Sequence, residues 1–167
     1  DFFTLGQAVL RMIGDIRGVV IDDEDLHRLA HAMQIMPPHP DVAEALSTMK
    51  ARGLRLVTLT NSPPGHGNRT PLSNAGLADY FERQFSVDEL RVFKPAPQLY
   101  ANVSTALGVD AADCMMVAAH VWDTIGAQTA GMRGALIARP GNAVLPVPGL
   151  EPTLVAADLG ELAAVLT

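Results

Sequence analysis

One stretch, residues 114–131, constrains the fold more than any other part of the chain. It reads as an apolar run at 114–119, a polar break at His120, and a helical pattern that opens near Asp123. A buried strand that leads through a tight turn into a helix is the repeating unit of a parallel sheet. In such sheets ligands bind where the strands end and the helices begin, which we call the carboxyl edge. Asp123 is therefore either a helix N-cap or a site residue.

The composition limits the class of protein. The chain has 167 residues, 49% of them hydrophobic, which suffices for one globular domain with a small appendage. Its net charge of −6 argues against nucleic acid or an anionic membrane as a partner. No apolar run approaches the roughly 18 residues of a membrane span. With a single cysteine and no signal-peptide pattern, we expect a cytoplasmic protein.

The first part of the chain is expected to be helical. Asp1 can cap a helix whose apolar residues recur at helical spacing until Gly14 or Gly18 interrupts it. The segment 36–40, MPPHP, is a rigid extended connector, since each proline disfavours helix in the residue before it. We take it as the boundary between a helical part and an α/β part. The chain lacks an initiator Met and starts directly in a helical pattern, so we expect a fragment.

Two interpretations compete for residues 18–33. The apolar residues before Asp22 could form a strand that presents paired carboxylates as metal ligands or as a nucleophile. Alternatively, a short link leads to a helix capped by Asp22 or Asp23, with further acids in a first turn that the helix dipole favours. The helical spacing of the apolar residues that follow favours the helix.

The α/β part alternates strands and helices. The expected strands are 54–60, 84–87, 114–119, 135–138 and 154–156, and the expected helices are 41–52, 71–75, 95–107, a helix from 123 and 159–166. This alternation predicts a doubly wound parallel sheet.

Three polar groups follow predicted strands and should meet at the carboxyl edge. They are Thr60-Asn61-Ser62, Lys94, and His120 with Asp123. A hydroxyl and an amide can hold an oxyanion, a lysine can offset negative charge, and a carboxylate can orient or activate water. Each group alone also has a structural explanation: a strand end, a solvated lysine, or a helix cap. Their coincidence at successive strand ends favours a hydrolytic site that handles an anion.

The order of three short motifs identifies a family. T-N at a strand end is followed by K-P-x-P-x-x-Y, and then by an apolar strand with W-D-x-x-G-A-x-x-A-G. This order resembles the haloacid dehalogenase superfamily, and more narrowly the type II (S)-2-haloacid dehalogenases. The resemblance implies a Rossmann-like α/β core at 37–167 with helices on both faces of a parallel sheet. It also implies the remnant of a helical cap at 1–36, which supports the helical interpretation of residues 18–33.

The same resemblance separates two chemistries. Phosphatases of this superfamily hold Mg²⁺ partly with an aspartate where this chain has Ala119, which offers no oxygen to a hard cation. The dehalogenases are metal-free, so we expect no metal and no cofactor. In their mechanism a carboxylate displaces halide at C2 with inversion, and water then hydrolyses the resulting ester. The implied reaction converts short-chain (S)-2-haloacids to (R)-2-hydroxyacids.

The resemblance also implies roles for individual residues. Thr60 and Asn61 would bind the carboxylate of the substrate. Lys94 would neutralise the nucleophile with support from Tyr100. Asp123 would help to activate water for hydrolysis of the ester.

The expected apolar pocket is less sharply defined. Trp122 and Phe2 would help to form it, although Trp122 could equally belong to the core. His120 stands where the better-known members carry Asn, and Ala118 where they carry Ser. His120 could donate to the halide or the substrate, although a lone histidine is more often a structural hydrogen-bonding residue.

Two functional residues of the family have no counterpart in this chain. They are the nucleophilic aspartate on the first core strand and an arginine early in the cap. We therefore expect a core without its central, nucleophile-bearing strand and no turnover by this chain alone. The resemblance suggests a homodimer. A magnesium-dependent phosphatase and a non-catalytic binding module remain the alternatives.

Overall fold

The computed structural model describes residues 1–62 and 70–166. Within these residues, three helices are followed by five strands with helices between most of them. In chain order the helices and strands are α1 Phe2–Arg17, α2 Asp23–Gln34, α3 Val42–Ala51, β1 Val57–Thr60, α4 Pro71–Asn74, β2 Arg83–Ser86, α5 Pro97–Leu107, β3 Met115–Ala118, α6 Val121–Thr129, β4 Arg133–Ile137, β5 Leu154–Ala156 and α7 Leu159–Val165. Short 3₁₀ turns lie at Ala78–Tyr80, Val87–Glu89 and Ala111–Asp113. Among the described helices, none has the length and apolar character needed to cross a membrane.

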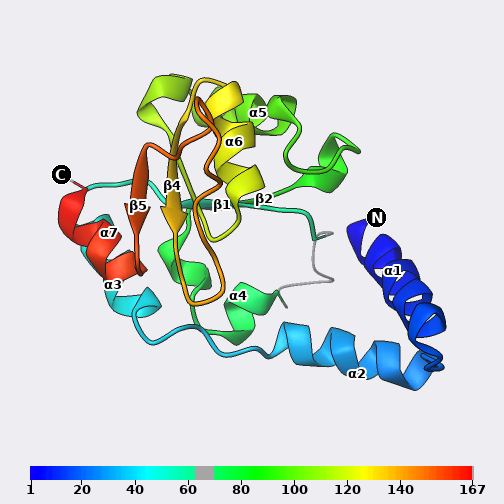
Figure 1. Ribbon diagram of the computed structural model, residues 1–167. Helices are drawn as coiled ribbons and strands as arrows, with labels where there is room; N and C mark the ends of the chain where they lie inside the picture. The colour runs from blue at the N-terminus through cyan, green and yellow to red at the C-terminus, as the bar shows by residue number, and fades with distance from the viewer. Residues whose placement is uncertain (63–69, 167) are drawn as a thin grey trace.

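The strands are parallel throughout, which confirms the predicted α/β class. They form two sheets instead of one: β1 pairs with β2, and β3, β4 and β5 pair in that order (Figure 1). Within the described residues, β1 and β3 are each hydrogen-bonded to a strand on one side only. The carboxyl ends of both strands nevertheless lead to residues that contact one another, as described below.

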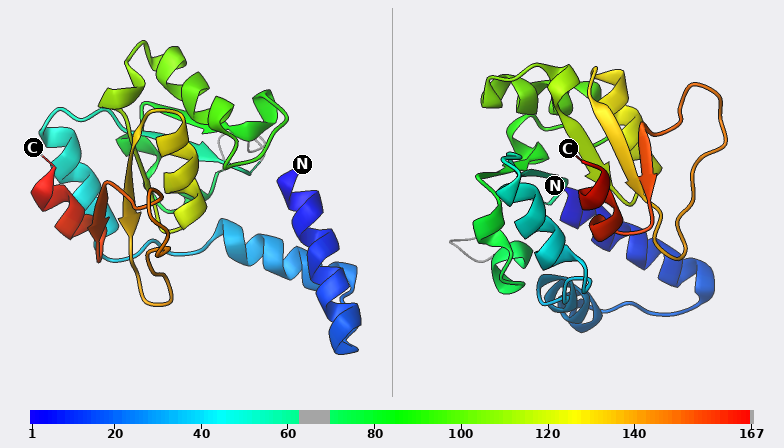
Figure 2. Two further views of the ribbon diagram at one scale, coloured as in Figure 1. Left: turned by 45° about the horizontal axis from the view of Figure 1, so that its top comes forward. Right: turned by 90° about the vertical axis from the view of Figure 1, so that its left-hand side faces the viewer.

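Helices cover the strands in two separate layers. Helices α3 and α7 pack with β4 and β5 in one apolar cluster, and Figures 1 and 2 show these two helices side by side. Helices α5 and α6 pack with β2 in a second cluster that contains the fully buried Phe85 and Tyr100. Burying apolar helix faces against both groups of strands supplies the main stabilising free energy of such a fold.

The ends of the first two helices follow from their sequence. The Asp1 side chain caps α1 by accepting a hydrogen bond from the Thr4 N–H at 2.8 Å, and the helix ends at Gly18 with a left-handed φ of 66°. Asp22 and Asp25 form a capping box at the start of α2. The helical interpretation of this acidic stretch is therefore confirmed, and the strand alternative is wrong.

Helices α1 and α2 form an arm that projects from the rest of the molecule (Figure 2). The arm contacts the remainder through the rings of Phe2 and Phe93, and through Asn74, whose amide donates to the Gln34 carbonyl at 2.9 Å. Large apolar side chains along the arm are exposed, and that of Met12 is 54% exposed. This geometry agrees with a cap remnant, and the assignment of residues 1–36 as a cap stays a prediction.

Four predicted boundaries are wrong by two or three residues, and one of them is the start of the helix expected from residue 123, which begins at Val121. The strand expected from residue 54 begins at Val57, because its partner β2 begins opposite it at Arg83. The helix expected from residue 95 begins at Pro97, since Ala96 precedes a proline and is held in an extended conformation with ψ 122°. Strand β4, which was expected from residue 135, begins at Arg133, where its pairing with β3 starts.

Candidate active site

A buried ion pair joins two of the three predicted polar groups. The Nζ of Lys94 lies 3.0 Å from Oδ1 of Asp123, and the two side chains are 12% and 4% exposed. Lys94 precedes α5, whereas Asp123 lies in the first turn of α6, whose N-cap is His120. The interpretation of Asp123 as the N-cap is therefore wrong. A carboxylate buried to this degree requires a charged or hydrogen-bonding partner, which Lys94 provides.

Tyr100 completes this cluster from α5. Its hydroxyl donates a hydrogen bond to the same Oδ1 of Asp123 at 3.3 Å, and the residue is only 1% exposed. Burial raises the pKa of Tyr100 above its ordinary value, and the negative charge of Asp123 and the hydrogen bond raise it further. Tyr100 is therefore a protonated donor at neutral pH. Both partners bind Oδ1, whereas Oδ2 of Asp123 has no hydrogen-bond partner among the residues that the structure describes.

The group at the end of β1 connects directly to Lys94. The side-chain oxygen of Asn61 accepts a hydrogen bond from the backbone N–H of Lys94 at 3.0 Å. Thr60 accepts from the N–H of Ser62 at 3.0 Å, which orders the turn that leaves the strand. In the described part of the chain, no group accepts a hydrogen bond from the amide nitrogen of Asn61. That nitrogen is therefore a candidate donor to an anion at this edge.

Gly126 is a packing residue beside the candidate site that sequence reasoning missed. A Cβ on Gly126 would lie 2.5 Å from the carbonyl oxygen of Pro95 and 2.6 Å from Cε2 of Tyr100. Only glycine lets α6 approach the Lys94 turn closely enough for Asp123 to meet Lys94. The available signal was a glycine in the interior of a helix, where it costs stability unless close packing requires it.

His120 and Trp122 lie at the start of α6, where β3 ends. Their rings are stacked, with centroids 4.4 Å apart and planes inclined by 12°. Trp122 is 47% exposed, so the alternative that it belongs to the core is wrong. Phe2, expected in the same apolar pocket, makes its aromatic contact with Phe93 at 5.4 Å. The structure thus places Phe2 beside the residue that precedes Lys94, and shows no contact between Phe2 and Trp122.

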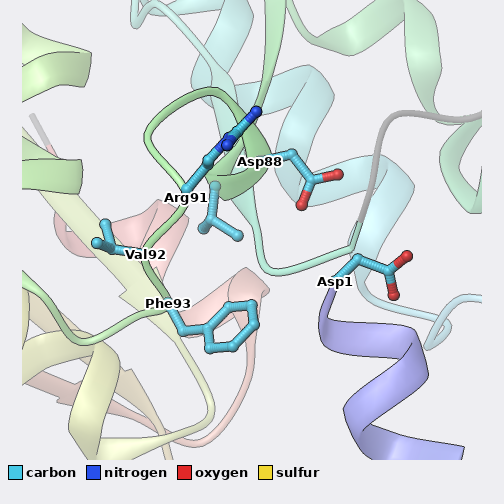
Figure 3. Close-up of a pocket in the computed structure, with 6 residues that line it drawn as sticks. Asp1, Asp88, Arg91, Val92 and Phe93 are labelled. Atoms are coloured by element: carbon cyan, nitrogen blue, oxygen red, sulfur yellow. The ribbon is translucent and has the colours of Figure 1, made fainter.

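A pocket of about 480 Å³ lies beside this cluster, between the start of α1 and the loop that precedes Lys94. Figure 3 shows the side chains of Asp1, Asp88 and Phe93 around it. The remaining lining residues are Val87, Arg91 and Val92. None of the predicted site residues lines this pocket, so the pocket does not contain the ion pair.

The described residues contain no group of three or more His, Cys, Asp or Glu side chains arranged to hold a metal ion. The partners of Asp123 are a lysine and a tyrosine, which donate hydrogen bonds and do not ligate a divalent cation. This arrangement suits hydrogen-bond and charge stabilisation of an anion. Metal independence itself stays a prediction.

The fold and the site together define an α/β protein with a lysine–aspartate pair at its carboxyl edge. Residues 7–131 match a family model described as haloacid dehalogenase-like hydrolase. The chain belongs to this family, which confirms the resemblance inferred from the sequence motifs.

The chain is similar to several named proteins of this family. The chain is 34% identical over 125 residues to an (S)-2-haloacid dehalogenase of Pseudomonas sp. (strain YL), covering 75% of this chain and 53% of the relative. A crystal structure of an L-2-haloacid dehalogenase matches with 25% identity and a TM-score of 0.89, over 98% of this chain and 71% of that one. The L-2-haloacid dehalogenase from Xanthobacter autotrophicus, with chloropropionic acid covalently bound, matches with 28% identity and a TM-score of 0.81, over 98% and 75%. The chain spans about half the length of the first two curated relatives, 53% and 54%.

Proposed function

We propose that the complete protein to which this chain belongs hydrolyses short-chain (S)-2-haloacids to (R)-2-hydroxyacids and halide. The observation that carries the proposal is the buried cluster of Lys94, Asp123 and Tyr100, joined through Lys94 to Asn61 at the carboxyl edge. Its relatives named (S)-2-haloacid dehalogenase support the choice of substrate. Residues 1–36 would belong to the cap and residues 37–167 to the core.

The substrate carboxylate would bind at the end of β1. The hydroxyl of Thr60 and the amide nitrogen of Asn61 are donors of the kind that hold an oxyanion. The carbonyl oxygen of Asn61 is already occupied by the backbone of Lys94, so the amide is held in one orientation. Trp122 and Phe2 would provide apolar surface for the rest of the acid.

The first chemical step requires an aspartate that this chain does not contain in a suitable position. We propose that it lies on a strand between β1 and β3, each of which pairs on one side only within the described residues. Its carboxylate oxygen would attack C2 from the side opposite the halogen. The C–O bond forms as the carbon–halogen bond breaks, and the halide leaves with the bonding electrons. Lys94 would hold the attacking carboxylate by charge.

Hydrolysis of the ester would then depend on Asp123. Its Oδ1 is held by Lys94 and Tyr100, and its free Oδ2 could accept a proton from water. The water oxygen would add to the carbonyl carbon of the ester, and the bond from that carbon to the ester oxygen would then break. The leaving oxygen would take the proton held by Asp123, so the hydroxyacid keeps its own bond from C2 to oxygen. We further propose that the protein works without a metal, in the cytoplasm and as a homodimer, as the resemblance implies.

The complete protein tests this proposal directly. We expect chloride release from (S)-2-chloropropionate and not from the R enantiomer, unaffected by a metal chelator. In a single turnover in H₂¹⁸O, the label should enter the enzyme and not the product, because water attacks the ester carbonyl. Label in the product would contradict the ester mechanism. Mg²⁺-dependent hydrolysis of a phosphate ester without dehalogenation would favour the phosphatase instead.

The chain of residues 1–167 by itself is expected to release no halide, since the resemblance implies a nucleophilic aspartate that has no counterpart in it. Stoichiometric chloride release by the purified chain would overturn this expectation. If Lys94→Ala and Asp123→Asn change nothing measurable in the complete protein, the binding module becomes the better explanation.

A further inference from the structure

We propose that Ser86 is a positioning residue for the substrate carboxylate. Its hydroxyl binds the carbonyl of Ser62 and thereby holds the turn after β1 in the orientation in which Thr60 and Asn61 meet the anion. The role of Ser86 rests on the proposed function, in which Thr60 and Asn61 bind the carboxylate. Ser86 itself does not contact the substrate and acts through the turn.

Ser86 lies beside Thr60 at the carboxyl edge. The two residues are register partners in the parallel pairing of β2 with β1, and each is the last residue of its strand. Ser86 is partly buried, and its backbone is extended, with φ −114° and ψ 145°. Because paired strands lie only about 4.8 Å apart, a short side chain at the end of β2 can reach the backbone that leaves β1.

The Ser86 hydroxyl makes two hydrogen bonds at this position. It donates to the carbonyl oxygen of Ser62 at 2.8 Å and accepts from the backbone N–H of Asp88 at 3.3 Å. A hydroxyl carries a single proton, and here Ser62 receives it. The bond from Asp88 holds the hydroxyl from the other side, so the Ser62 carbonyl is fixed relative to the end of β2.

Ser62 is therefore held at both of its polar backbone groups. Ser86 binds its carbonyl, and its N–H donates to Oγ1 of Thr60 at 3.0 Å. Since this N–H occupies a lone pair of the Thr60 hydroxyl, the proton of that hydroxyl remains for another acceptor. Within residues 1–62 and 70–166, no protein group accepts it. A carboxylate at this edge would accept it, so the orientation of Ser62 sets the direction in which Thr60 donates.

A second hydrogen bond ties the same turn to Lys94. Oδ1 of Asn61 accepts from the backbone N–H of Lys94 at 3.0 Å, and the Nζ of Lys94 is held separately by Asp123. Loss of the Ser86 hydroxyl should therefore loosen the turn and leave the ion pair in place. The carboxylate is bound alike in the ground state and the transition state, so weaker binding should raise KM and leave kcat nearly unchanged.

The test measures carboxylate binding and turnover by the complete protein. Calorimetry gives the Kd of propionate, a carboxylate without a halogen, and steady-state rates give kcat and KM for (S)-2-chloropropionate. For Ser86→Ala we expect Kd and KM to rise together about three- to tenfold, as for the loss of one hydrogen bond, with kcat within about twofold. Ser86→Thr keeps the hydroxyl, and a β-branched side chain suits the extended backbone, so it should restore both constants.

Ser104→Ala is the matched control. Ser104 is 6% exposed, and its hydroxyl donates to the Ala101 carbonyl within α5 at 3.0 Å. The variant removes the same kind of hydrogen bond from a different element, so it should leave Kd and KM unchanged. A similar rise of both constants in Ser104→Ala and Ser86→Ala would overturn the positioning role.

The outcomes separate the role of Ser86 from the proposed function. A complete protein that binds propionate but releases no chloride refutes the dehalogenase, and its propionate constants still test Ser86. A protein that does neither refutes both. Unchanged constants in Ser86→Ala overturn the positioning role, as does a fall in kcat alone or a failure of Ser86→Thr to restore binding. If Ser86→Ala does not fold, Ser86→Cys, which has a weaker S–H donor, gives the same comparison.

Discussion

Two buried ion pairs of this molecule have similar chemistry and different surroundings. Lys94 and Asp123 meet at 3.0 Å, and Arg139 and Asp41 meet at 2.7 Å. Each pair joins segments that are far apart in the chain, and all four side chains are less than one-fifth exposed. Distance and burial alone therefore do not distinguish a functional pair from a structural one.

The neighbours of each carboxylate make the distinction. Asp41 also accepts a hydrogen bond from the backbone N–H of Leu159 at 2.9 Å, so it ties the start of α3 to the end of β4 and the start of α7. Both partners of Asp41 belong to segments that hold the fold together. Asp123 instead meets a lysine and a tyrosine beside Asn61, at an edge where ligands bind. We therefore interpret the Asp41 pair as structural and the Asp123 pair as functional.

The largest effect that would test this contrast is on turnover. Asp123→Asn in the complete protein should lower kcat by about 10²–10⁴-fold, because the residue that accepts the proton of water is lost. The covalent ester should accumulate and be visible by intact mass spectrometry. Asp41→Asn is the matched control, and its folded fraction should keep the wild-type kcat. Equal kcat losses in the two variants would erase the distinction between the pairs.

The next effect concerns the close approach that brings Asp123 to Lys94. Gly126→Ala places a methyl group within 2.6 Å of Tyr100 and 2.5 Å of the Pro95 carbonyl, which forces α6 away. We expect a loss of about 1–3 kcal/mol in the free energy of unfolding, together with reduced turnover. Gly6→Ala is the control, because nothing lies within 4 Å of its Cβ position in α1. Chemical denaturation and steady-state rates of both variants measure the difference.

The Asp41 pair should affect stability and its dependence on pH. The hydrogen bond from Arg139 lowers the pKa of Asp41 from 3.8 to about 2, against the opposing effect of burial. A lowered pKa in the folded state means that this stabilisation is fully present above about pH 4 and is lost as the pH falls toward 2. Asp41→Asn should lower the free energy of unfolding by about 1–3 kcal/mol at neutral pH. It should also reduce the fall in that free energy as the pH is lowered from about 4 toward 2. If the free energy of unfolding of the variant falls with acid as it does in the wild type, other carboxylates cause that fall.

The smallest effect is expected at an exposed pair. Arg55 binds Glu82 through two hydrogen bonds, with side chains 50% and 39% exposed. This contact raises the pKa of Arg55 and lowers the pKa of Glu82. Solvent screening weakens such a pair, so Glu82→Gln should change neither turnover nor the midpoint of thermal unfolding measurably. A clear loss of stability would show that the two hydrogen bonds of this pair stabilise the fold despite the exposure of both side chains to solvent.

Sequence reasoning located most elements because their signals are local. Asp1 was recognised as a cap, and the second cap was narrowed to Asp22 or Asp23, because capping involves residues within one turn. The start of β1 was placed three residues early, since a strand begins where its partner begins and that partner is remote in sequence. The division into two sheets likewise depends on pairing and not on local pattern.

Site reasoning anticipated one grouping of side chains. The expected grouping of Lys94, Tyr100 and Asp123 agrees with the contacts in the structure, although their chemical roles stay predictions. The stack of His120 on Trp122 was not foreseen, and neither was the close approach at Gly126. Both depend on side-chain rotation and helix packing, which a linear pattern does not encode.

The sequence by itself determined the α/β class, the order of helices and strands, and the family, because periodicity, caps and short motifs are properties of neighbouring residues. Only the tertiary structure decided which partners surround each buried carboxylate. Asp41 and Asp123 both stand near the start of a helix and both find a cation. Their difference arises from what packs around them, because a carboxylate acquires its role from partners that the fold brings from distant parts of the chain.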